Sequence, residues 1–520
     1  MSGFKLTHSG SSLTTGTSLV VTAQDRCPQL EADQEEGLAA LRLEVSTAEK
    51  MLSALGQARS LRELVLRSGC RDEEVGRIVR EVLLVNKSLH TLTLDLRECS
   101  DHGATYLSEL IQKTPSIKHL TLMLNNVTAV GAEVLAGALP SSPLLSLTLY
   151  ATQMDLHDCC VGDEGARLFA SALPHCTHLT AFGLAQSGNT PTGLEYLLQS
   201  LEENPRITSL NLLSNFINGV GAASISRFLS TTSHLQQLNL SENHYIGDEG
   251  ARELALSLSH NSCLEVLCLK SCGIGQSGAK RFADPLAQNT SLRVLNLCGN
   301  GEIGDDGVEM IARGLRGNSG LRELDLSSCG VTDEGCDHLA GALSTTGTTL
   351  THLTLHKNCI SDGGAVSLAH CLTKNRCLLV LVLSENPVGE KGVTALGKAL
   401  EMNTTLTSLV LGAAGGGERG SRSPFPSSSR GTRDSESRKL AGTETRGSPV
   451  EARGEEGGRR GKRVLQMLPE GGPVSSSSTL ALVEALVSKN RRLAAYKETI
   501  RELRDRVKTL EEESRDRINS

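Results

Sequence analysis

The chain has 520 residues and a formal net charge of −7, and only 2% of its residues are aromatic, with no tryptophan. This length exceeds what one hydrophobic core needs, so we expect several domains or an array of repeats. The scarcity of aromatic side chains disfavours surfaces that stack bases or sugars, and no apolar run reaches the ~20 residues of a membrane-spanning helix. The 15 cysteines are scattered, which favours reduced thiols in an intracellular protein.

The first 56 residues are predicted to hold a disordered, Ser/Thr-rich start followed by one helix. The apolar residues of that helix recur every three or four positions, which is the spacing of a single helical face. They are Leu38, Leu41, Val45, Ala48, Leu52 and Leu55. Because the end of a repeat array exposes an apolar layer, we expect this segment to act as an N-terminal capping helix.

Residues 57–412 repeat one frame, L-x-x-L-x-L, thirteen times. Successive copies start 27 to 29 residues apart, except for one interval of 35. The frame starts at Leu61, Leu89, Ile117, Leu144, Leu179, Ile207, Leu235, Leu264, Leu292, Leu321, Leu350, Leu378 and Leu406. This regularity indicates a solenoid in which each copy forms one layer.

Each copy combines a short strand with a helix. In the copy that starts at Leu235, Leu238 and Leu240 alternate as on one face of a strand. Three residues past the last Leu of a frame stands Asn or Cys, as at Asn243, where an amide can satisfy backbone groups between layers. A turn follows in which Asp248, like Asp163 in an earlier copy, suits the N-cap of its own helix. The segment "ARELALSL" then places its apolar residues on one helical stripe.

The repeat resembles the ribonuclease-inhibitor type of leucine-rich repeat, which also occurs in NOD-like receptors and Ran GTPase-activating proteins. The resemblance covers about residues 57–412 and implies an α/β horseshoe solenoid of about 13 repeats of 28–29 residues, with strands inside and helices outside. Such a motif is specific for the fold and says little about function.

In this fold the variable strand positions line the concave face, so they are the candidate binding residues. They are mostly small, polar and uncharged, which suits an adaptable protein-binding surface better than a catalytic cleft. An exposed strand without any binding role would also tolerate them. The candidates are Asp95, Met123, Tyr150, Leu213, Asn239, Lys270, Asp325 and His356.

The long repeat that starts at Leu144 contains "MDLHDCC", with His157 and Cys159 before its helix and His175 after it. These residue types are zinc ligands. A helix of about ten residues would separate the two groups by ~15 Å, so we favour a surface loop over a metal site. No phosphate-binding or nucleophile motif is present, so we expect no metal and no cofactor.

Two different segments follow the repeats. Residues 413–477 are rich in Gly, Ser, Arg and Glu, which predicts a disordered linker. Between residues 413 and 463 it has 12 basic and 7 acidic residues, a net +5, and "RRGKR" at 459–463 leaves a nuclear location open. Residues 478–520 predict a coiled coil, broken only by Lys489, or alternatively a helix that folds back onto the last repeat. The predicted seam is Leu482, Leu486, Leu493, Tyr496, Ile500, Leu503, Val507 and Leu510.

These features favour a non-enzymatic protein-protein interaction scaffold or adaptor in the cytoplasm. The horseshoe would bind a protein partner and the coiled coil would form a homo-oligomer, while membrane and nucleic acid are not expected partners. The alternative is a regulator of a small GTPase, of the GTPase-activating type. Against that alternative, no catalytic arginine can be assigned and the segment after the repeats is basic rather than acidic. The neutral concave face and the lack of tryptophan also disfavour ribonuclease inhibition.

Overall fold

The computed structural model describes residues 3–8, 17–24, 41–43, 61–68, 72–96, 98–151, 161–345 and 347–411. Most of the repeat array is therefore described. The predicted linker at 413–477, the predicted coiled coil at 478–520 and "MDLHDCC" at 154–160 lie outside the described residues. In the described part of the chain, no helix is long and apolar enough to cross a membrane.

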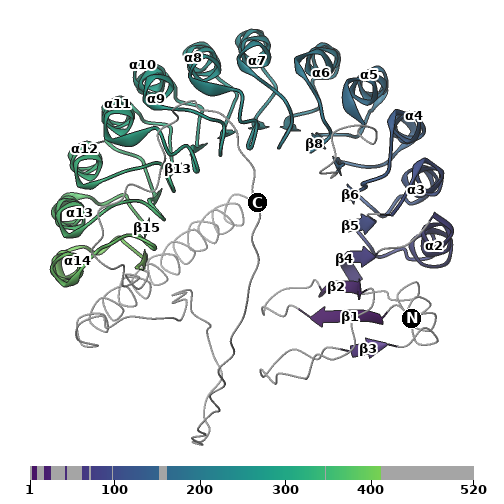
Figure 1. Cartoon of the computed structure of the whole chain (residues 1–520), viewed down its shortest axis with the longest axis horizontal. Helices are drawn as coiled ribbons and strands as arrows, with labels where there is room; N and C mark the ends of the chain where they lie inside the picture. The colour runs from purple at the N-terminus through teal and green to yellow at the C-terminus, as the bar shows by residue number, and fades with distance from the viewer. Residues whose placement is uncertain are drawn as a thin grey trace, which may run out of the picture.

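Thirteen parallel strands, β4 to β16, line the inner side of an arc and are paired in sequence order (Figure 1). Each of them contains residues of one L-x-x-L-x-L frame, so the predicted repeat number and order are confirmed. The strands are β4 (Leu61–Ser68), β5 (Thr91–Leu96), β6 (His119–Met123), β7 (Ser146–Tyr150), β8 (Ala181–Ala185), β9 (Ser209–Asn211), β10 (Gln237–Asn239), β11 (Val266–Cys268), β12 (Val294–Asn296), β13 (Glu323–Asp325), β14 (His352–Thr354), β15 (Val380–Val382) and β16 (Ser408–Val410).

Helices form the outer side of the same arc (Figure 1). They are α2 (Asp72–Ile78), α3 (Asp101–Lys113), α4 (Ala129–Ala138), α5 (Gly162–Ala172), α6 (Pro191–Glu203), α7 (Gly219–Thr231), α8 (Gly247–Leu258), α9 (Gln276–Ala279), α10 (Ala283–Gln288), α11 (Gly304–Gly317), α12 (Asp333–Leu343), α13 (Asp362–Lys374) and α14 (Glu390–Met402). Short 3-10 or π turns extend α2, α4 and α5. The helix of the eighth repeat is split into α9 and α10 near Pro285, which lacks the N–H that a continuous helix requires.

The frame leucines form one continuous core between the strands and the helices. Leu238 and Leu240 are almost completely buried, and their equivalents in the adjacent layers stack on them. Parallel register places Leu238 between Leu210 and Leu267. One layer leaves its core side chains open on both sides, and the neighbouring layers cover them.

The predicted N-terminal capping helix is wrong where the structure can test it. Residues Leu41–Leu43 form strand β3, which pairs with β1 (Gly3–His8). β1 also pairs with β2 (Thr17–Gln24), and β2 pairs in parallel with β4. These strands occupy the hydrogen-bonding edge that β4 would otherwise leave open. The alternating Leu41-Arg42-Leu43 fits a strand as well as a helix, so spacing alone could not decide between them.

An asparagine ladder links several pairs of adjacent layers at the ends of their strands. Asn243 Oδ1 accepts hydrogen bonds from the backbone N–H groups of Asn215 and Ile217 in the preceding repeat, both at 3.1 Å. Its Nδ2 donates to the carbonyl groups of Leu212 and Leu240. The same pattern recurs at Asn215, Asn300, Asn358 and Asn386. The predicted role of this Asn position is therefore confirmed.

A cysteine at the ladder position does not make the same contacts as an asparagine. The Cys272 thiol donates to the Leu240 carbonyl at 3.2 Å and has no amide oxygen for the preceding loop. That loop instead contains an extra residue, Gly247, at φ 59°, whose N–H donates to the Cys272 carbonyl. Gly304 and Cys329 form the same arrangement. A left-handed conformation favours glycine. The sequence "IGD" therefore occurs only before those helices whose preceding loop contains the extra residue.

The turn aspartates also act between repeats, contrary to our expectation for their own helices. Asp248 Oδ1 accepts from the N–H groups of Gly275 and Gly278, at the start of the next helix. Asp163 accepts in the same way from Thr190, the N-cap residue of α6. Helix α8 itself has no side-chain N-cap hydrogen bond. The predicted N-cap role of both aspartates is therefore wrong, because each satisfies the free N–H groups of its neighbour's helix.

Candidate protein-binding surface

The eight candidate residues lie on the strands that form the inner side of the arc, at or just after positions between buried leucines. Asp95 is buried and Lys270 is exposed, whereas the other six are half-buried. Parallel pairing stacks equivalent positions, so that Asp95 lies beside Met123, and Met123 beside Tyr150. The array therefore brings these candidates together as rows across neighbouring repeats.

The first part of this surface is uncharged. Strands β6 to β9 and Leu213 contain no Asp, Glu, Lys or Arg. Their accessible side chains are mainly threonine, serine and asparagine, together with Met123, Tyr150 and Leu213. We call the concave residues of β6–β9 with Leu213 the neutral half.

The second part carries charges of both signs. Lys270 Nζ lies 3.3 Å from Glu242 Oε1 of the preceding repeat, and both side chains are partly exposed. Further along, Glu323 and Asp325 occupy one strand and His352 occupies the next. His352 Nδ1 lies 3.9 Å from Glu323 Oε1. We call the concave residues of β10–β15, with the residues that directly follow each strand, the charged half.

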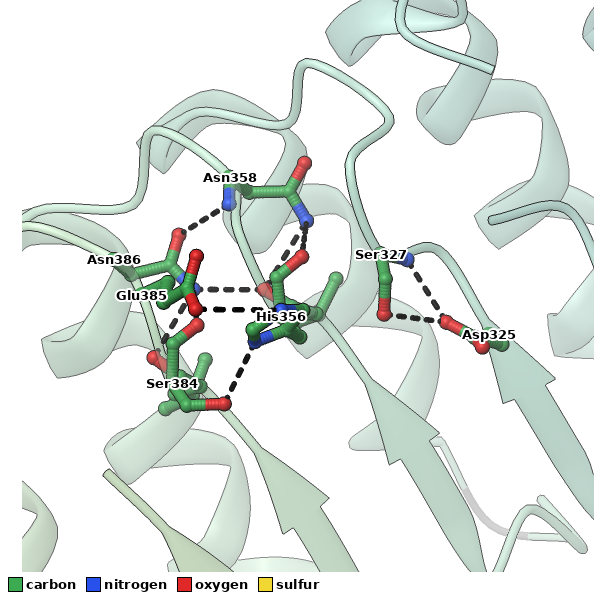
Figure 2. Close-up of polar contacts among 9 residues, drawn as sticks. Asp325, Ser327, His356, Asn358, Ser384, Glu385 and Asn386 are labelled. Atoms are coloured by element: carbon green, nitrogen blue, oxygen red, sulfur yellow. Dashed lines mark hydrogen bonds and ion pairs between the residues drawn. The ribbon is translucent and has the colours of Figure 1, made fainter. Parts of the chain in front are cut away.

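Figure 2 shows a polar network in this charged half. His356 Nδ1 lies 2.8 Å from Ser384 Oγ, and His356 Nε2 lies 3.9 Å from Glu385 Oε1. Asp325 accepts hydrogen bonds from the backbone N–H and the hydroxyl of Ser327, at 2.9 and 2.6 Å. These contacts fix the rotamers of the side chains that face the arc's interior.

A serine beside a histidine and a carboxylate invites comparison with a hydrolytic triad. The distance from His356 to Glu385 is beyond hydrogen-bond range, and the His356 side chain is 38% exposed. Ser384 and Glu385 are consecutive residues in the turn that follows β15. This geometry suits hydrogen bonding to a partner and lacks the tight orientation of the histidine that nucleophilic catalysis requires.

The described cysteines do not form a metal site. No group of three His, Cys, Asp or Glu side chains among the described residues could hold a metal ion. Cys176, which directly follows His175, is buried, and burial raises the pKa of its thiol to about 11. Burial likewise raises the pKa of the Cys272 thiol to about 12. Such thiols stay protonated at neutral pH and pack as small apolar side chains.

Sequence reasoning missed two features of this surface. The residue before each ladder position adopts a left-handed conformation even where it is charged, as at Glu242, Lys357 and Glu385. This backbone conformation places the side chains of Glu242, Lys357 and Glu385 just past the end of each strand, beside the loops. In those loops Phe216 and Tyr245 are exposed aromatic residues. The signal of Phe216 was present in the sequence, since several other repeats have glycine at the corresponding position, as at Gly188, Gly273 and Gly330.

Comparison with known proteins agrees with the fold. The profile described as "Leucine Rich repeat" matches residues 114–136, 232–255, 260–283, 288–312, 317–340, 348–369 and 374–397. The chain is 30% identical over 332 residues to the ribonuclease inhibitor of Sus scrofa, covering 63% of this chain and 71% of that protein. Over 325 residues it is 28% identical to the ribonuclease inhibitor of Mus musculus, covering 56% and 69%.

A second group of relatives is much longer than the matched region. The chain is 31% identical over 328 residues to the human "NACHT, LRR and PYD domains-containing protein 5", covering 61% of this chain. The match spans only 26% of that protein. This similarity therefore gives no information about the function of the other parts of those proteins.

Proposed function

This chain belongs to the ribonuclease-inhibitor type of leucine-rich-repeat proteins, and from that premise we propose that it is a non-enzymatic adaptor that binds a protein partner on its concave face. The observation that carries the proposal is the open row of half-buried candidates, from Met123 to His356, on a rigid strand scaffold. A surface of this kind can contact a large partner at many points, whereas a small molecule would be left uncovered.

The rigid scaffold supports binding without large rearrangement. Many adjacent layers are fixed to one another by the asparagine ladder, and aspartates such as Asp248 add further hydrogen bonds between layers. Concave side chains such as Asp325 and His356 are also held by neighbouring hydroxyl groups. Preorganised side chains lose less conformational entropy on binding, which favours affinity.

The tail adds self-association to the proposal. Residues 413–477 would serve as a flexible tether, and the heptad seam from Leu482 to Leu510 would pair two or more chains. Linking several horseshoes raises the effective concentration of binding sites for a partner that is itself multivalent. We place this adaptor in the cytoplasm.

Co-purification from a cell lysate tests the proposal. The full-length chain is compared with a version that ends at Gly412 and with full-length Tyr150→Glu, and binding to recovered proteins is then measured with purified components. We expect the same direct partner with both lengths, weaker capture by the truncated chain and loss of capture by Tyr150→Glu. A partner that requires the tail but tolerates Tyr150→Glu would contradict concave-face binding.

Inhibition of a pancreatic ribonuclease separates this chain from its named relative. Proteins that act on nucleic acid present basic surfaces, and strong binding to them calls for an acidic face. Here the neutral half has no acidic side chain, and the charged half places Lys270 beside Glu242 and His352 beside Glu323. We expect no inhibition at a stoichiometric ratio, and full inhibition would show that the ligand class of the relative is retained.

A further inference from the structure

Three large apolar side chains are exposed on the loops that join strands to helices in two adjacent repeats. Phe216 is 42% exposed, Val220 69% and Tyr245 69%. Phe216 and Val220 flank the start of α7, and Tyr245 lies just before α8. We call these three residues the rim patch. Exposed aromatic residues that cluster in this way mark interaction surfaces in soluble proteins.

Backbone contacts bring the two loops together. Asn218 forms an isolated parallel β-bridge with Tyr245. Asn218 also caps α7, accepting hydrogen bonds from the N–H groups of Val220 and Gly221. A side-chain carbon placed on Gly219 would lie 3.7 Å from Glu249 Cβ at the start of α8. The three apolar side chains therefore stand on one hydrogen-bonded segment of the rim.

Neighbouring repeats show that the fold does not require these side chains. The residue that corresponds to Phe216 is Gly188 in the repeat before and Gly273 in the repeat after Tyr245, both with positive φ. At the helix position of Val220, the repeats on either side have Thr192 and Glu249. Other repeats therefore fold with glycine or a polar residue at the positions of Phe216 and Val220, so the array does not require large apolar side chains there.

The surroundings of the patch are electrically neutral. Residues 207–226 contain no Asp, Glu, Lys or Arg. The charged side chains nearby have partners within the chain: Glu249 contacts Arg252, Glu242 contacts Lys270, and Asp248 accepts backbone hydrogen bonds from Gly275 and Gly278. A ligand that brought an unpaired charge here would lose hydration and gain no counterion, whereas an uncharged apolar ligand would lose nothing.

We propose that the rim patch is a docking site for an uncharged, apolar segment of a protein partner, which inserts an aliphatic or aromatic anchor between Phe216 and Tyr245. The inference rests on the proposed protein-binding function and adds the chemistry of the partner. The patch continues the neutral half, because Leu213 precedes Phe216 by three residues on the same segment. Anchor residues of this kind supply most of the binding energy of a protein interface.

A displayed library of random peptides provides the probe. The full-length protein is used to select binders, and the triple variant Phe216→Ser/Val220→Ser/Tyr245→Ser is used to measure how far they depend on the patch. We expect enriched peptides with a large apolar anchor and few charges, which bind the variant at least about tenfold more weakly. Affinity should change little between about 50 mM and about 500 mM NaCl.

A matched triple variant controls for loss of exposed apolar surface. Val130→Ser/Leu256→Ser/Val366→Ser changes exposed apolar residues of other helices and should bind the peptides as the original chain does. Circular dichroism melting of both variants checks the fold. Enrichment of charged peptides with salt-sensitive binding, equal binding to the patch variant, or no enrichment at all would each overturn the inference. Peptides that bind the patch variant normally but lose binding to Tyr150→Glu would retain concave-face binding and overturn the rim patch alone.

Discussion

The neutral and the charged halves of the concave face share one backbone and differ only in the residues placed on it. In the neutral half Met123, Tyr150 and Leu213 offer apolar area. In the charged half Lys270, Asp325 and His356 offer hydrogen bonds and ion pairs that neighbouring repeats already organise. Apolar area supplies affinity that salt hardly affects, and charges supply orientation and salt-dependent association. One partner bound along the arc would thus meet two different kinds of contact.

The largest effect is expected from removing hydrogen bonds in the interior beneath the charged half. Asn358→Ala removes five side-chain hydrogen bonds and leaves the N–H groups of Cys329 and Val331 buried without their acceptor. We expect a loss of about 2–4 kcal/mol in unfolding free energy, measured by urea denaturation. Hydrogen exchange should show the charged half opening first, because each layer depends on its neighbours.

Asn239→Ala is the matched control for this change. Asn239 is half-buried on the concave face, and its side chain accepts one hydrogen bond, from the Ser241 N–H at 3.0 Å. Its loss should cost less than about 1 kcal/mol. Equal losses for the two variants would show that the ladder does not hold the layers together.

A charge placed in the neutral half should weaken partner binding more than the same charge in the charged half. Tyr150→Glu would put an unpaired carboxylate in an apolar contact, and we expect at least about tenfold weaker binding of a purified partner. Thr354→Glu is the counterpart between two charged repeats and should change affinity by less than about threefold. Isothermal titration with both variants checks the comparison, which fails if the two changes have equal effects.

Reversing one charge in the charged half should affect mainly the rate of association. Lys270→Glu breaks the 3.3 Å contact with Glu242 and places two carboxylates together. We expect a several-fold change in the association rate, in a direction set by the partner's charge, and a changed salt dependence. Surface plasmon resonance at low and high salt measures both quantities. An effect confined to the dissociation rate would place Lys270 within an apolar contact instead.

The smallest effect concerns the acid stability of the repeats that carry the charged half. Burial would raise the pKa of Asp333, but hydrogen bonds from Ser361 and Gly364 outweigh it and hold that pKa below 3.8. The ionised form is therefore favoured by folding, and its contribution is present at neutral pH and lost as the pH falls below 3.8 through the lowered folded value. Asp333→Asn should cost less than about 1 kcal/mol at pH 7, and the difference should disappear near pH 2. A constant difference across this range would contradict the assignment.

The periodic part of the fold could be predicted from the sequence, because each frame leucine has the same burial in every layer. The positions of Leu238 and its equivalents predicted the number and order of the strands and the buried face of each strand. The concave candidates followed because buried and accessible residues alternate along a strand. The Asn243 position also followed, since a buried polar side chain must find partners.

Contacts between repeats could not be read from one repeat alone. Asp248 satisfies the next helix rather than its own, and this depends on how two layers are offset. Asparagine also stands three residues before seven of the thirteen frames, a position whose contacts we did not predict. Asn289, for example, donates to the carbonyl groups of Leu258 and Asn261 in the preceding repeat. At the N-terminus the apolar residues have helical spacing, yet strands form there because strand pairing satisfies the hydrogen-bonding groups at the open edge of β4.

The two kinds of layer junction give the arc an uneven mechanical compliance. An asparagine such as Asn300 ties two layers through two amide bonds, whereas Cys272 and Cys329 leave one thiol contact and one backbone bond from a loop glycine. Small rotations at successive junctions add up along a solenoid. We therefore expect the β10–β11 and β12–β13 junctions to bend more easily under load than the asparagine junctions beside them, so two buried cysteines influence the width of the object that the horseshoe can straddle.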